Sequence, residues 1–223
     1  MTRARQRSEH LFQQLETISS AQLGHEDEDT ESLTSIQSQL VLRATDTQKQ
    51  PRMKKFRFQL LHQWLLENFP PSKAADIGGG KGLLSFLLAQ SGWDMTVIDP
   101  VKQSLPTKYK DLEIGKRVRI APTQTIQQIT AEFNPDQAAG FDILIGMHAH
   151  GCNAKIIDSA AQFGCVFVLF PCCVIDEPFY PRLGVHWLEA LADYAINKGH
   201  TLRPFRLNFK GQNIGLIGGK NLG

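Results

Sequence analysis

The sequence predicts an α/β fold built on a mostly parallel sheet with helices on both faces. From residue 51 onward, short apolar segments alternate with amphipathic ones, which is typical of parallel strands joined by right-handed helical crossovers. Residues 143–145 and 166–169 are apolar without interruption, as strands buried on both faces are. Two final strands, separated by residues 210–212, indicate a terminal antiparallel hairpin.

The individual elements follow from spacing along the chain. A helix is expected where apolar residues recur every three or four positions, and a strand where a short apolar run lies between turn residues. Pro70 and Pro71 end the first helix, because proline cannot continue the hydrogen-bonding ladder. The expected helices cover residues 56–66, 83–90, 125–133, 154–162 and 187–197. The expected strands cover residues 74–77, 95–98, 118–120, 141–147, 165–170, 202–209 and 213–217.

The chain divides at about residue 50. Its 223 residues, 42% hydrophobic, suit one folded domain over residues 51–223 with an appendage. Residues 1–50 are polar and carry five Lys or Arg against eight Asp or Glu. Two short helical patterns occur there, at residues 11–18 and 33–40, so we expect a partly helical or mobile extension. Because its composition gives the core little to bury, the extension is expected to be dispensable for folding.

Composition also bears on the cellular compartment. Four cysteines, two of them adjacent, do not form the framework of a secreted disulfide protein and are read as reduced thiols. No apolar run approaches the roughly 20 residues of a membrane-spanning helix, and no secretory signal follows Arg3, Arg5 and Arg7. We therefore expect a cytoplasmic protein with no membrane partner, with a mitochondrial location as the alternative that the N-terminal arginines suggest.

The sharpest signal is a glycine-rich loop between the first strand and the next helix. Asp76 begins it, and Gly78, Gly80 and Gly82 alternate along it. Glycines allow a tight turn and a close approach of a ligand to the backbone, and the helix N-terminus beyond offers free amides. Lys81 is followed by glycine instead of the Ser or Thr of a phosphate-binding P-loop, which excludes that kind of site.

The dinucleotide fingerprint is excluded as well, because Leu83 stands where it needs Gly or Ala. Asp99 ends the next strand, 23 residues after Asp76, a spacing that suits one βαβ unit. A carboxylate there can accept hydrogen bonds from both hydroxyls of a ribose. The acidic-x-Gly-x-Gly-x-Gly pattern from Asp76 to Gly82, with Asp99 downstream, resembles that of class I S-adenosylmethionine-dependent methyltransferases.

This resemblance covers about residues 54–218 and implies a Rossmann-like class I methyltransferase fold, with a seven-stranded sheet and S-adenosylmethionine as cofactor. Members often carry an acidic residue near the adenine after the third strand. Residues 120–124, which follow the expected third strand, contain none, so Thr123 or Gln124 is the expected substitute. The cofactor-binding residues that the resemblance implies are Asp76, Gly78, Gly80, Gly82, Asp99 and Thr123.

A second motif follows the strands at 141–147 and 165–170, which are neighbours in the methyltransferase strand order. His148 comes directly after the first strand, and Cys172 and Cys173 follow the second. This pair resembles the methyltransferase-like protein 25 group and the related eukaryotic tRNA ribose 2′-O-methyltransferases, in which the position near His150 tends to be Cys or Asp. The resemblance implies RNA as a partner, and His148 and Cys172 as catalytic residues near the transferring methyl group.

Three chemical interpretations of this cluster stay open. His148, His150, Cys172 and Cys173 have the right ligand types for zinc, although adjacent cysteines rarely both reach one metal. Cys172 is alternatively a nucleophile activated by a nearby histidine. The favoured interpretation assigns no metal: His148 shapes the pocket, and the cysteines pack as small apolar residues.

Two further segments are open to a structural and a functional interpretation. Residues 176–181 hold two carboxylates and two aromatic rings, and either line or cover a substrate pocket or form a plain connection. The basic residues within 52–57 either contact phosphates or form a solvated helix face.

Two functions of different class fit these observations. The first is an S-adenosylmethionine-dependent methyltransferase whose acceptor the sequence does not name. The second is a non-catalytic methyltransferase-like module that binds a partner through its acidic extension and basic helix. An intact glycine loop with Asp99 favours the first. The oligomeric state has no signal in the sequence.

Overall fold

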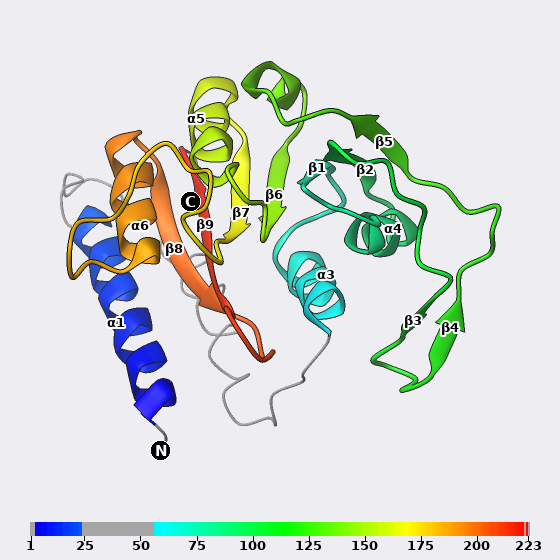
Figure 1. Ribbon diagram of the computed structural model, residues 1–223, viewed down its shortest axis with the longest axis horizontal. Coiled ribbons are helices and arrows are strands. Elements are labelled where there is room, and N and C mark those ends of the chain that lie inside the picture. The colour runs from blue at the N-terminus through cyan, green and yellow to red at the C-terminus, as the bar shows by residue number, and fades with distance from the viewer. Residues whose placement is uncertain (1–2, 24–55, 221, 223) are drawn as a thin grey trace, which may run out of the picture.

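The computed structural model describes residues 3–23, 56–220 and 222, and its centre is one seven-stranded sheet (Figure 1). The strand order is β5-β2-β1-β6-β7-β9-β8. Every neighbouring pair is parallel except those made by β9, which runs antiparallel to both β7 and β8. The strands are β1 (Lys73–Ile77), β2 (Asp94–Asp99), β5 (Gln127–Thr130), β6 (Ile143–Met147), β7 (Val166–Phe170), β8 (Thr201–Arg206) and β9 (Ile214–Gly219).

This topology confirms the predicted fold class. Counted along the chain, the strands of the sheet lie in the order third, second, first, fourth, fifth, seventh, sixth. That order, with a single antiparallel strand inside a terminal hairpin, is the Rossmann-like class I methyltransferase fold that the resemblance implied. The helices that the sequence predicts at residues 83–90 and 187–197 occur with the same bounds, as α4 (Leu83–Gln90) and α6 (Trp187–Asn197).

Helices cover both faces of the sheet and bury a separate core on each. One face packs against α1 (Arg3–Leu23), α5 (Asn153–Phe163) and α6. The other packs against α3 (Arg57–Asn68) and α4. Alternate strand residues divide between the two cores, as in Ala75 and Ala74 of β1, because successive side chains of a strand point to opposite faces. Among the described helices, none is long and apolar enough to cross a membrane.

The third strand of the sheet differs from the sequence prediction. The segment expected to be a helix at residues 125–133 is the edge strand β5, and its spacing of Ile126, Ile129 and Phe133 only imitates helical periodicity. Parallel pairing with β2 overrides that local pattern, because the edge of the sheet offers a full ladder of hydrogen bonds. The next helical segment is the short 3₁₀ helix η2 (Pro135–Ala138).

The strand expected at residues 118–120 is not part of the seven-stranded sheet. Residues 117–119 form β4 (Arg117–Arg119), which pairs with β3 (Lys108–Lys110) in a separate two-stranded ribbon. Ile120 and Tyr109 pack this ribbon onto Phe86 of α4. Figure 1 shows the ribbon standing apart from the main sheet, at the end beyond β5.

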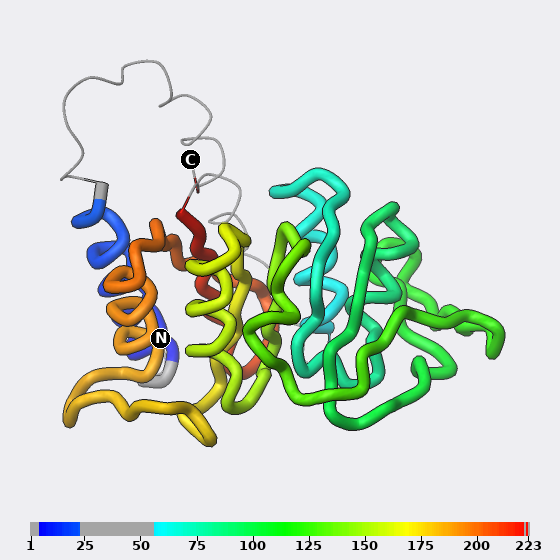
Figure 2. The backbone as a smooth tube through the Cα atoms, turned by 90° about the horizontal axis from the view of Figure 1, so that it is seen from above, coloured from blue at the N-terminus to red at the C-terminus, as the bar shows by residue number. Residues whose placement is uncertain are grey.

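The N-terminal segment also departs from expectation. Residues 11–18 form the predicted helical pattern within α1, but the expectation that residues 1–50 give the core little to bury is wrong for this helix. Leu11, Phe12 and Leu15 are buried in the core that α6 shares, and α1 lies beside α6 in both views (Figures 1 and 2). The second pattern, at residues 33–40, lies outside the described residues.

Polar contacts fix α1 along β8, the edge strand of the sheet. The side chain of Gln22 makes two hydrogen bonds to the backbone at the start of β8. Its amide nitrogen donates to the carbonyl of His200 at 2.9 Å, and its oxygen accepts from the amide of Leu202 at 3.1 Å. Arg206 donates to the carboxylate of Glu9 at 2.7 Å and lies over the ring of Phe12. The helix therefore covers an edge that would otherwise expose unpaired backbone groups.

Candidate functional site

The carboxyl ends of the parallel strands meet along one edge of the sheet. The glycine loop follows β1, and Asp99 ends β2. Turns carrying His148 and Cys172 follow β6 and β7. The loop between β8 and β9 lies at the same edge, because β9 starts opposite the end of β8 and runs antiparallel to β7. In open α/β sheets this edge is where ligands bind.

The glycine loop requires glycine for two different reasons. Gly78, Gly80 and Gly82 have φ angles of 67°, 56° and 69°, a region in which a side chain costs about 1–2 kcal/mol. Gly79 has an ordinary φ, but a Cβ there would lie 2.6 Å from the Asp76 carboxylate carbon. A Cβ at Gly80 would meet only the Gln103 side chain, at 3.7 Å, so the loop is open on that side.

Asp76 is buried beneath the loop. Its Oδ2 accepts a hydrogen bond from the hydroxyl of Ser85 in α4 at 2.9 Å. Burial raises the pKa of the Asp76 carboxyl to about 6, the Ser85 hydrogen bond opposes that rise, and the negative charge of Asp99 adds to it. A carboxyl with this pKa readily changes its charge when a cation approaches.

Asp99 joins the end of β2 to the glycine loop. Its Oδ2 accepts from the amide of Gly80 at 2.9 Å, and its Oδ1 accepts from the amide of Val101 at 2.8 Å. The side chain is buried. Each carboxylate oxygen has two lone pairs, so both oxygens keep acceptor capacity for the two hydroxyls of a ribose.

The structure does not place Thr123 where the sequence predicts a cofactor-binding residue. It was expected to follow the third strand of the sheet, but it precedes that strand, β5, and its side chain is exposed. The residue that does follow β5 and carries an acidic group is Glu132. Its charge, together with those of Glu177 and Asp99, contributes to the raised pKa of the Cys152 thiol, although burial is the larger cause. Glu132 was missed because its strand imitates a helix.

His148 lines a cavity of about 370 Å³ at the same edge. Its φ of 61° is positive, and the only other described non-glycine residue with positive φ is Asp176. Strained backbone of this kind gathers at functional sites. Burial, with smaller contributions from the positive charges of Arg57 and His150, lowers the pKa of His148 to about 4, so the imidazole is neutral at pH 7.

The rest of that cavity combines cations with aromatic rings. It is lined by Arg57 and Phe58 at the start of α3 and by Phe209, Lys210 and Gln212 of the β8–β9 loop, with Gly211 between them. Positive side chains beside aromatic faces suit a phosphorylated, base-containing ligand. The other basic residues expected at the helix start, Arg52, Lys54 and Lys55, lie outside the described residues.

A larger cavity, of about 570 Å³, borders the other side of the glycine loop. It is lined by residues 80–82, 102–107 and much of 120–128. Neither Asp76 nor Asp99 lines it, although Gly80 does. The Asp99 carboxylate therefore meets the Gly80 amide outside the lining of this larger cavity.

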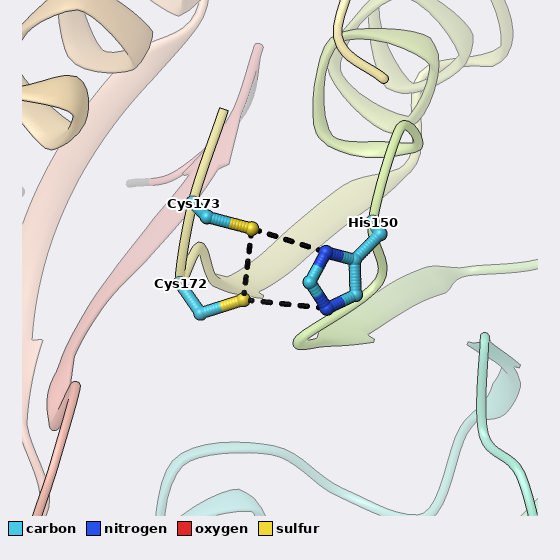
Figure 3. A group of neighbouring side chains, drawn as sticks. All are labelled: His150, Cys172 and Cys173. Atoms are coloured by element: carbon cyan, nitrogen blue, oxygen red, sulfur yellow. Dashed lines mark hydrogen bonds between the residues drawn. The ribbon is translucent and has the colours of Figure 1, made fainter. Parts of the chain in front are cut away.

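The histidine and cysteine motifs form a cluster that differs from the expected set. His150, Cys172 and Cys173 converge, with ligand atoms within 4.8 Å of one another (Figure 3). Cys173 Sγ lies 3.0 Å from His150 Nδ1, and Cys172 Sγ lies 3.8 Å from His150 Nε2. His148 is not part of this group and lies in the cavity beside Phe209. Both adjacent cysteines thus point to one partner, contrary to expectation.

Cys172 is poorly prepared to act as a nucleophile. Partial burial, with smaller contributions from the hydrogen bond and charge of Cys173, raises the pKa of its thiol to about 11. Thiolate, the reactive form, is therefore scarce at pH 7. The interpretation of Cys172 as a nucleophile finds no support in this environment.

The segment at residues 176–181 has a structural use. The carboxylate of Glu177 caps the start of α5, accepting from the amides of Asn153 at 2.9 Å and Ala154 at 3.1 Å. Phe179 stacks on Tyr194 of α6 with ring centroids 4.8 Å apart. The two side chains anchor this connection to the helices α5 and α6, so for these two residues the structure favours the interpretation as a plain connection.

The strand order defines a domain with the Rossmann-like fold of class I methyltransferases. No family model matches the chain. Two curated proteins, each described as a probable tRNA (uracil-O(2)-)-methyltransferase, come from Caenorhabditis elegans and Caenorhabditis briggsae. They are 34% identical to the chain over 104 and 103 residues. The match covers 46% of this chain and 17% of each relative, so the chain spans a small part of their length.

Solved structures show weaker similarity. A precorrin-6y C5,15-methyltransferase from Geobacter metallireducens has a TM-score of 0.43 and 11% identity, over 75% of this chain and 92% of its own. A magnesium protoporphyrin IX methyltransferase from Synechocystis has a TM-score of 0.45 and 16% identity, over 72% and 76%. The strand order, and not these similarities, defines the fold.

Proposed function

We propose that the chain is an S-adenosylmethionine-dependent methyltransferase. The observation that carries this proposal is the 2.9 Å hydrogen bond between the Gly80 amide and Asp99 Oδ2, which joins the glycine loop to the carboxylate at the end of β2. This arrangement leaves the amides at the start of α4 and two carboxylate oxygens at the edge where open α/β sheets bind ligands. Similarity to two curated methyltransferases supports it.

The residues present fit this cofactor. Asp99 would hold the ribose hydroxyls through its free lone pairs, and the open space above Gly80 would take the amino acid part. Asp76, ionised, would attract the ammonium group. The bound cofactor supplies an electrophilic methyl group, and the contribution of the chain is to fix donor and acceptor in line and exclude water.

We further propose that the acceptor is a hydroxyl group of RNA. The cavity at His148 places a neutral imidazole beside Arg57 and Lys210, with the rings of Phe58 and Phe209 close by. The cations suit phosphates, and the partly exposed ring of Phe58 suits a base, whereas the buried ring of Phe209 supports the cavity wall. A neutral imidazole can accept the proton that a hydroxyl loses as its oxygen attacks the methyl group. The curated relatives are described as acting on tRNA.

The test is transfer of a labelled methyl group from S-adenosylmethionine to unmodified tRNA by the full chain. Digestion of the product to nucleosides and mass spectrometry then locate the methyl group. The proposal expects a ribose-methylated nucleoside that the Asp99→Ala variant does not produce. Label recovered on a base, or on protein alone, would contradict the RNA hydroxyl.

The runner-up is a non-catalytic module that binds the cofactor or a partner without turnover. Of its acidic extension, residues 1–50, the part from residue 24 onward lies outside the described residues. Tight binding of S-adenosylhomocysteine with no transfer to tRNA, total RNA or protein extract would favour this second function.

A further inference from the structure

The cluster of His150, Cys172 and Cys173 has nearly the spacing of a metal site. With Zn–S near 2.3 Å and Zn–N near 2.0–2.1 Å, a tetrahedral centre places its sulfurs about 3.8 Å apart and sulfur and nitrogen about 3.5 Å apart. The two Sγ atoms lie 3.5 Å apart, Cys173 Sγ lies 3.0 Å from His150 Nδ1, and Cys172 Sγ lies 3.8 Å from His150 Nε2. With one ring nitrogen as the ligand atom, the three ligand atoms lie within 4.8 Å of one another. Rotation of the imidazole that turns one nitrogen toward both sulfurs would bring all three groups around one ion.

We propose that His150, Cys172 and Cys173 bind one zinc ion. Imidazole nitrogen and thiolate sulfur are the ligands that zinc prefers in proteins. Figure 3 shows the imidazole facing both thiols, with one ring nitrogen toward each sulfur. Binding selects one of these nitrogens by rotation of the ring, a torsion that varies easily in histidine.

The fold brings these three residues together from two neighbouring strands. His150 lies in the turn after β6, and the cysteines follow β7, whose last residue Phe170 pairs with Met147 at the end of β6. Adjacent residues in an extended strand point to opposite sides. Here the chain has left the strand at Phe170, and both thiols turn toward the same imidazole. Convergence of adjacent side chains is not the default of an extended chain, and it is the arrangement that a shared ligand needs.

The site would leave one coordination position open. Among the described residues, the candidate cluster contains three ligands and no fourth histidine, cysteine or carboxylate. His150 and Cys172 are exposed, so solvent reaches these two ligand side chains. Two cysteines with one histidine and an open position form a donor set known from catalytic zinc sites. We therefore infer that water, or an oxygen or nitrogen atom of a small ligand, completes the shell.

Metal content of the purified full chain tests the site directly, without any assay of methyl transfer. We expect about one zinc per chain after growth with zinc and passage over a desalting column. The variants His150→Ala, Cys172→Ser and Cys173→Ser should each lose it. Cys152→Ser is the matched control: this half-buried thiol lies outside the cluster, at the N-cap of α5 where serine is favoured, and its zinc content should equal that of the unmodified chain.

Cobalt substitution tests the geometry. We expect Co²⁺ to give thiolate charge-transfer absorption and the strong visible bands of four-coordination, and azide to shift the visible bands by entering the open position. Absence of metal from a folded chain, with all four thiols free to react or with Cys172 and Cys173 joined in a disulfide, would overturn the proposal. Zinc retained in all three cluster variants would overturn it as well. Because these measurements use metal alone, their failure leaves the cofactor site untouched, and failure of cofactor binding leaves them unaffected.

Discussion

The amide of Gly80 donates a 2.9 Å hydrogen bond to the carboxylate of Asp99, nineteen residues further along the chain. This contact fixes the glycine loop of β1 against the end of β2, and it orients the Asp99 side chain toward the ligand edge of the sheet. We therefore expect substitution of either residue to disturb the geometry of the other.

Gly80→Val should weaken S-adenosylhomocysteine binding by at least about tenfold, because the new side chain fills the open space above the loop. Thermal shift with increasing ligand measures the effect. Gly115→Val is the matched control: its φ of 65° is close to the 56° of Gly80, and nothing lies within 4 Å of its Cβ position. Both variants carry the same backbone strain, so equal loss of ligand response would contradict a role for Gly80 in binding.

Cofactor affinity should fall as the pH drops below about 6, because protonated Asp76 no longer attracts an ammonium group. Roughly tenfold weaker binding is expected at pH 5 than at pH 7. The pKa of His148, about 4, keeps that group neutral through this window. Equilibrium dialysis with labelled S-adenosylhomocysteine measures the profile, and Asp76→Asn should flatten it. An unchanged slope in that variant would assign the dependence to another group.

The same carboxyl should make stability depend on pH. Its pKa rises from 3.8 to about 6 in the folded chain, so the folded state holds more protons between these values, and stability falls as pH rises through that window. A shift of about two units corresponds to about 3 kcal/mol. Urea unfolding at pH 4.5 and pH 7 should show the decline, and Asp76→Asn should remove it.

Leu15→Ala should destabilise the chain by about 2–5 kcal/mol, because Leu15 of α1 is fully buried against the core shared with α6. Chemical denaturation followed by circular dichroism measures the loss. Leu183→Ala makes the same chemical change at a fully exposed side chain and should cost little. Equal stability of the two variants would show that α1 does not pack on the sheet in solution.

His148→Asn should lower methyl transfer about a hundredfold while leaving S-adenosylhomocysteine binding unchanged, because the imidazole acts on the acceptor and not on the cofactor. Asparagine is chosen since it tolerates the positive φ of 61° better than alanine. His62→Asn serves as control, at a half-buried histidine of α3 whose Nε2 lies 2.9 Å from the Ser91 hydroxyl. Full activity of His148→Asn would remove this residue from the mechanism.

Most of the central sheet could be predicted from the sequence. Its strands are buried on both faces, and their short apolar runs are typical of such strands. The glycine loop could also be predicted. Asp76 and Asp99 lie near the carboxyl ends of two adjacent parallel strands, and that pairing fixes where the two residues lie. Predictions of secondary structure that rest on local periodicity alone are less reliable. Ile126 and Ile129 have helical spacing, and only pairing with β2 makes that segment a strand.

Errors in one element carried into the site. Because the spacing of residues 125–133 predicts a helix, the sequence places Thr123 after the third strand and gives no signal for Glu132. The docking of α1 was hidden for another reason, since a short amphipathic helix in a polar segment shows no partner in the sequence. The cluster at His150 depends on side-chain directions after two strands, and residue spacing alone does not encode such directions.

We propose that the chain binds S-adenosylmethionine through Asp99 and the glycine loop. Isothermal titration of the full chain with S-adenosylhomocysteine tests it most directly. We predict binding of one ligand per chain with a dissociation constant between roughly 1 μM and 1 mM, lost in a folded Asp99→Ala variant. No heat of binding with the folded, unmodified chain, or unchanged binding by Asp99→Ala, would contradict it.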